Sequence, residues 1–525
     1  MKIKNEKTKD FFIALAIVFA GAVFLLFFKI KHSMTFPNLD EFLWMYRSRF
    51  FMDRVLDFDF ANLIQSYHPG IMVMWAAGPF MEIINYDFNS IARFIKSLND
   101  SGVGYNVINS QNQDLYDSYK SVSFLFNIPI FAAIFLFIFS LYYLLRKLAL
   151  GRWAIIFSLL LIVTTPYYIY FTTPTDKFVG IFSTLGVLSL LVYAKNKNAK
   201  KFLILSAIFS AWAVLTKMSA LFLIPFSFFV LAVYELNFQH GRKALNEGEQ
   251  TFVRLRLERI SEFLRDKFIL ILATFKLPLK NTIKNFLLWL AVFFLTSVIF
   301  FPTILANPRA VMNLIIKESS ERIITENHSL LFAPNVALAY LSDPFALSFN
   351  LFVIIVFFGF LFLLIKNIFR ISPRSPRWSL SSEPACPVGK PVCRLGRDSS
   401  ELRAFSSQSP EEEPACRQTG LRLGREKISV NNEILLLYFY CFSFFAFIVL
   451  FSKTYSFRYL VPILVIFQIL AGAGIYEFAN IFIKKNKITD KKLIYIWAII
   501  FILVSQGLLI YFSEIARIEN LPYFG

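Results

Sequence analysis

Long runs of apolar residues alternate with short polar segments along most of the chain. Residues 11–28 read FFIALAIVFAGAVFLLFF and carry no charge. A helix of that length is long enough to cross about 30 Å of hydrocarbon. About eleven runs of this kind predict transmembrane helices, and we place them near residues 11–30, 122–145, 153–171, 177–194, 202–216, 219–235, 285–305, 345–365, 433–452, 459–481 and 493–513. The pattern predicts an all-α polytopic membrane protein.

One apolar stretch is too long for a single crossing. Residues 202–235 would form a helix of roughly 50 Å at about 1.5 Å per residue. Lys217 is the only charge inside this stretch before Glu235 at its end. We therefore expect two transmembrane helices that are joined by a turn near Lys217.

Composition agrees with a membrane protein. The chain is 57% hydrophobic and 17% charged, whereas about a quarter of the residues in a soluble protein are charged. The positive charge is distributed unevenly, because 38 of the 54 Lys and Arg residues fall in residues 1–10, 146–152, 195–201, 236–284, 366–432 and 484–492. Cytoplasmic loops are enriched in Lys and Arg. We expect a multi-pass plasma-membrane protein with a cytoplasmic N-terminus.

The net charge of +19 does not require a nucleic-acid partner. The same loop asymmetry accounts for it, and basic loops also contact anionic membrane lipids. We therefore expect membrane lipids as partners and no nucleic acid.

The chain divides into three parts. Residues 1–370 form a transmembrane module with two long outer loops at 31–121 and 306–344, both with helical patterning. Residues 371–428 hold seven of the 21 Pro and three of the four Cys, and Glu-Pro-Ala-Cys occurs in them twice. This segment is predicted to be a disordered cytoplasmic insertion with an internal repeat. Residues 429–525 supply the C-terminal transmembrane helices.

The first outer loop opens with acidic residues on a helix. Residues 37–51 read PNLDEFLWMYRSRFF, in which Leu39, Phe42, Leu43, Tyr46, Phe50 and Phe51 recur at helical spacing. This pattern predicts an amphipathic helix at the membrane surface. Asp40 and Glu41 fall in its first turn, where acidic side chains stabilise a helix N-terminus. A carboxylate at the boundary between water and lipid is also suited to act as a general base. Taken alone, the first role is favoured, and the motifs that follow shift the balance towards the second.

Five short motifs lie in order at the predicted outer helix ends. They are Asp40-Glu41, Tyr67-His68-Pro69-Gly70, Thr173-Pro174-Thr175-Asp176-Lys177, Leu215-Thr216-Lys217 and Arg458-Tyr459-Leu460-Val461-Pro462. Taken together they resemble motifs of the C-type (GT-C) membrane glycosyltransferases. The likeness is to the bacterial branch related to protein O-mannosyltransferases and to the lipid A aminoarabinose transferase. The second motif departs from the family by having Gly70 in place of Pro, and the third by a residue inserted between Pro and Asp.

The resemblance implies a GT-C-like fold and a glycosyltransferase. Such an enzyme moves a sugar from a polyprenyl-phosphate donor to an acceptor hydroxyl of a protein, lipid or glycan on the outer face. Asp40 would then be the general base, and Lys217, Lys453 and Arg458 would bind the donor phosphate. Glu41, His68, Asp176 and Tyr459 would bind or orient substrates.

Each of these residues also has a simpler explanation. The three cations could extend to the lipid headgroups, Asp176 could cap its helix or pair with Lys177, and a His before Pro at a turn is often structural. A divalent metal ion is also left open. Asp40, Glu41, His68 and Asp176 could approach one ion, but no spacing of ligands demands it.

The alternative function is a polytopic transporter or a lipid-linked oligosaccharide flippase. Such proteins place polar sites near the middle of the bilayer and often contain internal repeats. In this chain the acidic residues fall at the outer ends of predicted helices, and the pattern of apolar runs does not repeat. The sequence therefore favours the enzyme.

Overall fold

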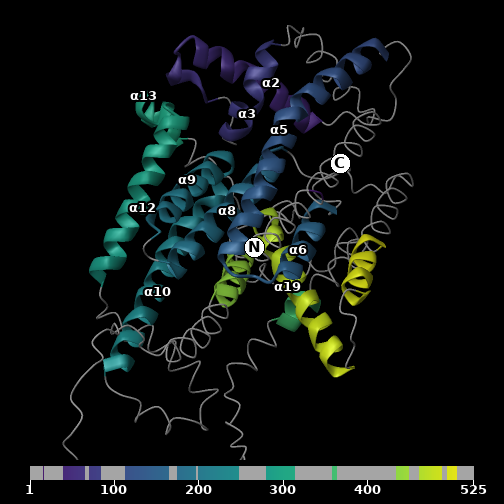
Figure 1. The fold of residues 1–525 in the computed structure, drawn as a ribbon. Coiled ribbons are helices and arrows are strands. Elements are labelled where there is room, and N and C mark those ends of the chain that lie inside the picture. The colour runs from purple at the N-terminus through teal and green to yellow at the C-terminus, as the bar shows by residue number, and fades with distance from the viewer. Residues whose placement is uncertain are drawn as a thin grey trace, which may run out of the picture.

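The computed structural model describes residues 39–64, 70–83, 113–164, 174–196, 199–246, 279–313, 358–363, 433–448, 460–486 and 493–504, together with residue 16. Side chains are described in these ranges except at 39–42, 113–121, 236–246, 279–280, 461 and 484–485. Regular structure in these ranges is helical throughout, with no strand (Figure 1). The all-α prediction is confirmed for this part of the chain.

Five described helices are long and apolar enough to cross a membrane: Val122–Lys147, Pro174–Lys195, Met218–Glu235, Asn281–Phe300 and Pro462–Ile483. Shorter apolar helices at Arg152–Thr164, Glu433–Ile448 and Leu493–Val504 coincide with three further predicted runs. The runs at 11–30 and 345–365 lie almost wholly outside the described residues. The protein is thus rich in helices suited to a membrane, and the total of about eleven stays a prediction.

The predicted break at Lys217 is confirmed. Helix α9 (Lys200–Thr216) ends just before Lys217, which has an extended backbone with φ −155° and ψ 128°. A short 3-10 helix η3 (Met218–Phe222) and helix α10 (Leu223–Asn246) follow. The predicted span 219–235 agrees with the apolar span Met218–Glu235, and the helix α10 itself continues to Asn246. Hydropathy indicates where a helix leaves the apolar region, and polar residues can extend the same helix further.

Helix α8 (Pro174–Lys195) lies at the centre of the described bundle (Figure 1). Every residue of α8 before Lys195 is buried, and the helix packs against α5 (Gln113–Lys147), α9, α10 and α19 (Val461–Lys485). Gly180, Ser183, Gly186 and Ser189 recur at every third position of α8. Small residues allow neighbouring backbones to approach closely in a membrane. A Cβ atom added at Gly186 would lie 2.9 Å from Oγ of Ser210 on α9.

Helix α12 (Leu279–Phe300) lies at the edge of the bundle (Figure 1). Its inner face packs on α9, where Nε1 of Trp289 donates a hydrogen bond to Oγ of Ser206 at 3.2 Å. Its opposite face exposes Leu287, Phe294 and Leu295. Large apolar side chains on the outside of a membrane bundle face lipid, so α12 is a peripheral helix.

Two helices that are distant in sequence meet backbone to backbone. Ser158 on α6 (Arg152–Thr164) donates a hydrogen bond from Oγ to the carbonyl of Ile469 on α19 at 3.1 Å. A Cβ atom at Gly472 would lie 2.4 Å from the backbone nitrogen of Ser158, and one at Gly474 would lie 1.9 Å from the carbonyl oxygen of Gly359. Only glycine fits at these two positions of α19 without displacing a neighbouring backbone.

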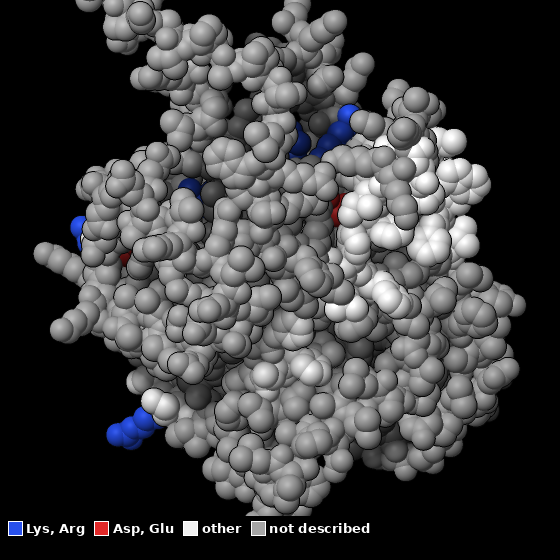
Figure 2. Space-filling view, turned by 90° about the horizontal axis from the view of Figure 1, so that it is seen from below, with Lys and Arg blue, Asp and Glu red and all other residues white. Residues whose placement is uncertain are grey.

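The two ends of the bundle differ in charge. At one end, α5 finishes with Arg146 and Lys147, and Nζ of Lys195 at the end of α8 donates to the carbonyl of Leu148 at 3.2 Å. Figure 2 looks onto this end, and the described charged side chains visible there are mostly Lys and Arg. The helical segments of the first loop cover the opposite end (Figure 1), which we call the α2–α3 end.

Candidate functional site

The described part of the loop 31–121 contains two helices that pack against each other. Helix α2 (Leu39–Leu56) contains Asp40 and Glu41 in its first turn, so the predicted helix is confirmed. It buries Trp44, Met45 and Phe51 and packs on α3 (Ile71–Ile83). Tyr46, which belongs to the apolar face predicted from the sequence, is exposed. The bulky side chains of Trp44 and Met45 lie on the face of α2 that is buried.

Gly70 explains the departure of the His-Pro-Gly turn from the family pattern. Its φ is +52°, and a Cβ atom there would lie 2.0 Å from ring carbons of Trp44. Proline is restricted to φ near −65°, and L-residues in general avoid the left-handed region. A second Pro at position 70 is therefore incompatible with the packing of α2 on this turn.

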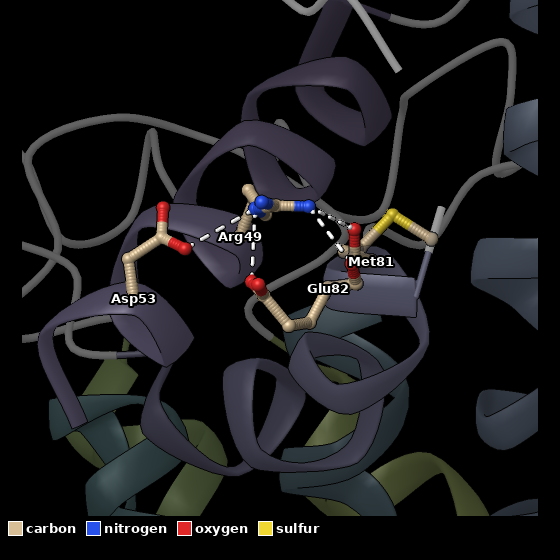
Figure 3. A network of polar contacts seen from close by, with 4 residues as sticks. All are labelled: Arg49, Asp53, Met81 and Glu82. Carbon is tan, nitrogen blue, oxygen red and sulfur yellow. Dashed lines mark hydrogen bonds and ion pairs between the residues drawn. The ribbon is translucent and has the colours of Figure 1, made fainter. Parts of the chain in front are cut away.

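Arg49 holds α2 and α3 together (Figure 3). Its Nε atom lies 3.2 Å from Oδ1 of Asp53 and 2.9 Å from Oε2 of Glu82. One terminal nitrogen of Arg49 also donates hydrogen bonds to the carbonyls of Met81 at 2.9 Å and Glu82 at 3.0 Å. The planar guanidinium can satisfy several acceptors at once. It thereby fixes the end of α3 against the middle of α2.

Two carboxyl groups of this loop have shifted pKa values. Burial raises the pKa of Glu82 above its ordinary value, and a hydrogen bond with Asp53 raises it further, whereas the positive charge of Arg49 lowers it. In contrast, a hydrogen bond from Asn62 lowers the pKa of Asp59, and Arg54 lowers it further. Of these two carboxyl groups, Glu82 therefore keeps its proton to the higher pH.

The α2–α3 pair is attached to the bundle at the end of α12. Nε1 of Trp75 on α3 donates a hydrogen bond to the carbonyl of Phe300 at 2.8 Å. The ring of Phe300 lies between those of Trp75 and Trp212, with ring centroids 6.2 Å and 5.4 Å apart. Both pairs have edge-to-face geometry, which aromatic pairs prefer. The loop is thus rigidly connected to α9 and α12.

Three of the five sequence motifs come together at this end. The backbone N–H of Gly70 donates to the carbonyl of Thr216 at 3.2 Å. The next residue, Lys217, places Nζ 2.6 Å from Oδ1 of Asp176 in the first turn of α8. Lys217 is 8% exposed and Asp176 is 1% exposed. Gly70, the turn at Thr216 and Lys217, and the first turn of α8 therefore form one buried junction.

The local backbone explains why Lys217 can reach Asp176. The side chain of Thr216 bonds back to the carbonyl of Trp212 at 2.7 Å, and the N–H of Lys217 donates to the carbonyl of Ala213 at 2.9 Å. These bonds close the last turn of α9, and the extended conformation of Lys217 then interrupts the helix. A pairing of Asp176 with Lys177 was one of the simpler explanations, and the structure shows an ion pair of Asp176 with Lys217.

The junction has the chemistry of an anion site with a built-in counter-ion. A buried charge is costly unless it is paired, and Asp176 supplies a partner for Lys217. The first N–H groups of a helix also favour negative charge, and α8 begins at Pro174. A phosphate oxygen that reached Lys217 would share the ammonium group with Asp176. The arrangement can bind and orient an anion.

The other candidate residues cannot be located in the same way. The side chains of Asp40 and Glu41 lie outside the described residues, as do His68, Lys453, Arg458 and Tyr459. Within the described ranges, no group of three or more His, Cys, Asp or Glu side chains could hold a metal ion. The roles assigned to these residues, and the question of a metal ion, stay predictions.

Sequence reasoning missed the attachments of the first loop. Arg49 and Asp53 are four residues apart on one helix and could have been paired from their spacing. Glu82 lies 33 residues from Arg49 and carries no such signal. The contact of Gly70 with Thr216 is likewise made through the backbone, which a pattern of side chains does not reveal.

No protein-family model, curated protein or solved structure matches this chain. The case for its function therefore depends on the junction of Gly70, Thr216, Lys217 and Asp176 and on the order of the motifs around it.

Proposed function

We propose that the chain is an integral membrane glycosyltransferase. It transfers a sugar from a polyprenyl-phosphate donor to an acceptor hydroxyl of a protein, lipid or glycan at the α2–α3 end, on the outer face of the membrane. The observation that carries the proposal is the buried Lys217–Asp176 pair, 2.6 Å between Nζ and Oδ1, joined through Thr216 to the turn at Gly70. Three motifs that resemble those of GT-C enzymes thus meet at one place.

The reaction assigns a task to each group. The acceptor oxygen attacks the anomeric carbon, its proton passes to a carboxylate, and the bond between the anomeric carbon and the phosphate oxygen breaks. The electron pair of that bond stays on the phosphate, which becomes more negative. Lys217 stabilises that charge, because a fixed cation contributes most where negative charge develops. Asp176 positions Lys217, and Asp40 is the proposed base.

The position of the pair favours this enzyme over a transporter or flippase. Asp176 lies in the first turn of α8, and Lys217 directly follows the last residue of α9. Both charges are therefore at helix ends. A transporter site is expected near the middle of the bilayer, between interrupted helices. A lipid phosphate headgroup, in contrast, lies at the level of the helix ends.

A transfer assay in proteoliposomes tests the proposal. Wild-type protein would be given a panel of labelled polyprenyl-phosphate sugars, with bacterial membranes as the source of acceptors. Asp40→Asn should lower the rate at least about 100-fold if it removes a general base. Lys217→Gln should lower it about 100-fold by loss of charge stabilisation, and Lys217→Arg should restore part of that loss.

Lys147→Gln is the matched control. Lys147 is an exposed cation at the opposite end of the bundle, so its variant should transfer sugar at the wild-type rate. Absence of transfer from every donor by folded wild-type protein would contradict the proposal. If the same vesicles moved the intact donor across the bilayer, the flippase function would replace it.

A further inference from the structure

Phe58 is an exposed aromatic residue in an unusual backbone conformation. Its side chain is 78% exposed, and its φ is +57°, which is rare for a bulky L-residue. The turn around it is fixed by polar contacts. Its N–H donates to the carbonyl of Val55 at 3.2 Å, and Arg54 forms an ion pair with Asp59. The fold thus holds this ring outward in a defined position.

The segment that follows Phe58 is attached to the end of α12. The carbonyl of Phe60, in the 3-10 helix η1 (Phe60–Asn62), accepts a hydrogen bond from Oγ1 of Thr303 at 2.7 Å. Thr303 begins α13 (Thr303–Ala306), the short helix after α12. The ring of Phe60 also contacts that of Phe58, with centroids 6.0 Å apart. Two segments far apart in sequence therefore form one continuous surface.

The α13 side of this surface is also apolar and exposed. Leu305 is 71% exposed and Met312 is 57% exposed. Between them lies Arg309, whose side chain is exposed as well. We call the set Phe58, Leu305, Arg309 and Met312 the rim. Apolar side chains interspersed with an Arg are typical of protein surfaces at the boundary between headgroups and acyl chains.

The rim continues the lipid-facing side of α12. That side exposes Phe294, Leu295 and Ile299, and α12 is one of the helices suited to cross a membrane. Leu305 follows Ile299 by six positions, which corresponds to about 9 Å of helical rise. The headgroup region is roughly 5–8 Å thick on each side of the hydrocarbon. If the hydrocarbon ends near the last exposed residues of α12, the rim therefore falls within the headgroup region.

We propose that the rim is a membrane-contact site that inserts into the phospholipid leaflet at the α2–α3 end. Phe58, Leu305 and Met312 enter the upper acyl region, and the Arg309 guanidinium binds lipid phosphate. The contact gives the first loop a second attachment, in addition to the hydrogen bonds of Gly70 and Trp75. It holds the loop at a fixed height above the bilayer and does not depend on which reaction occurs there.

Spin labels in the full-length protein test this contact. Cysteine would be introduced at position 58, 305 or 312 in a background in which Cys386, Cys393 and Cys416 are replaced by Ser. Cys441 is buried and stays unlabelled. In lipid nanodiscs, we expect each label to collide more often with oxygen, which concentrates in lipid, than with a water-soluble nickel chelate. The three positions are independent, so a label that disturbs the turn at Phe58 does not decide the result.

Ile83 is the matched control. It is also apolar and is 82% exposed, but it ends α3 beside the Arg49–Glu82 contact and is not attached to α13. A label at position 83 should collide more often with the nickel chelate. If labels at 305 and 312 showed that same preference for the chelate, the membrane contact would be wrong. Spin–spin broadening between labels, appearing only in nanodiscs with two protein copies, would instead assign the rim to self-association and also overturn it.

Discussion

Helices α8 and α12 are both long and apolar enough to cross a membrane, yet they occupy opposite positions. In the apolar span of α8, 100% of the residues are buried, whereas in that of α12 only 22% are buried. The hydrophobic effect does not determine which of the two helices is central, because lipid is as apolar as the protein interior. The difference follows from small residues along α8 and from bulky ones, such as Phe294 and Leu295, on α12. Side-chain size, more than hydrophobicity, selects the central helix.

The largest expected effect concerns the charge pair at the end of α8. Lys217→Met removes the ion-pair partner of the buried Asp176, and breaking a buried pair in this way costs about 3–5 kcal/mol. The double variant Lys217→Met with Asp176→Leu should recover most of that loss. Unfolding free energies measured by denaturant titration in mixed micelles would test this.

Lys147→Met serves as the reference for that experiment, since its cation is exposed and should change the stability by less than about 0.5 kcal/mol. A Lys217→Met variant as stable as this reference would mean that the pair contributes nothing to the fold.

The next effect compares the two helices directly. Leu188 on α8 is fully buried, whereas Leu295 on α12 is mostly exposed. Leu188→Ala should lower the unfolding free energy by about 2–5 kcal/mol, because it leaves a cavity among close-packed neighbours. Leu295→Ala should cost less than about 0.5 kcal/mol, since lipid chains refill the space. Equal losses at the two positions would show that α12 is covered by protein in the membrane.

The smallest effect is the pH dependence of the α2–α3 attachment. The pKa of Glu82 is raised in the fold above 4.5, so the folded protein keeps this proton to a higher pH than the unfolded chain. The stabilising contribution is complete below pH 4.5 and is lost as the pH rises through the folded pKa. Because Gln does not ionise, the stability of the Glu82→Gln variant should not fall in this way as the pH rises. The two proteins should therefore unfold alike at low pH, and wild type should fall below the variant as the pH rises.

Asp59 provides a control of opposite sign. Its pKa is lowered from 3.8, so the ionised form stabilises the fold above that pH, and the contribution is lost only as the pH falls further. Asp59→Asn should thus lower the stability at every pH above about 3.8, and the variant and wild type should converge as the pH falls further. A wild-type curve with no Glu82-dependent change at mildly acidic pH would refute the assignment.

Sequence reasoning was most successful where one physical constraint dominates. Apolar runs predicted the described transmembrane helices, and the single charge at Lys217 marked the turn between α9 and α10. The order of the motifs predicted that Asp176 and Lys217 belong to one site. It did not predict their direct contact, because Lys177 was an equally good partner by spacing. Nor did hydropathy reveal that α8 is central, since burial depends on packing between helices distant in sequence.

The left-handed backbone at Gly70 and Phe58 was also beyond prediction. Gly70 packs against Trp44, which is distant in sequence, whereas the conformation of Phe58 belongs to a local turn closed by Arg54 and Asp59. The proposed chemistry of Asp40 remains a prediction from resemblance, whereas the geometry of the Lys217–Asp176 pair is described atom by atom.

The glycine contacts of α19 have a consequence for biosynthesis. Ser158 and Ile469, which share a hydrogen bond, are 311 residues apart, so α6 leaves the ribosome long before the helix that covers it. Until then lipid must occupy the narrow surface around Ser158, and α19 has to displace it. The contact of α6 with α19 therefore joins an early and a late segment of the chain through their backbones. Residues 371–428 lie between α6 and α19 in the sequence. An insertion at this place therefore interrupts neither helix.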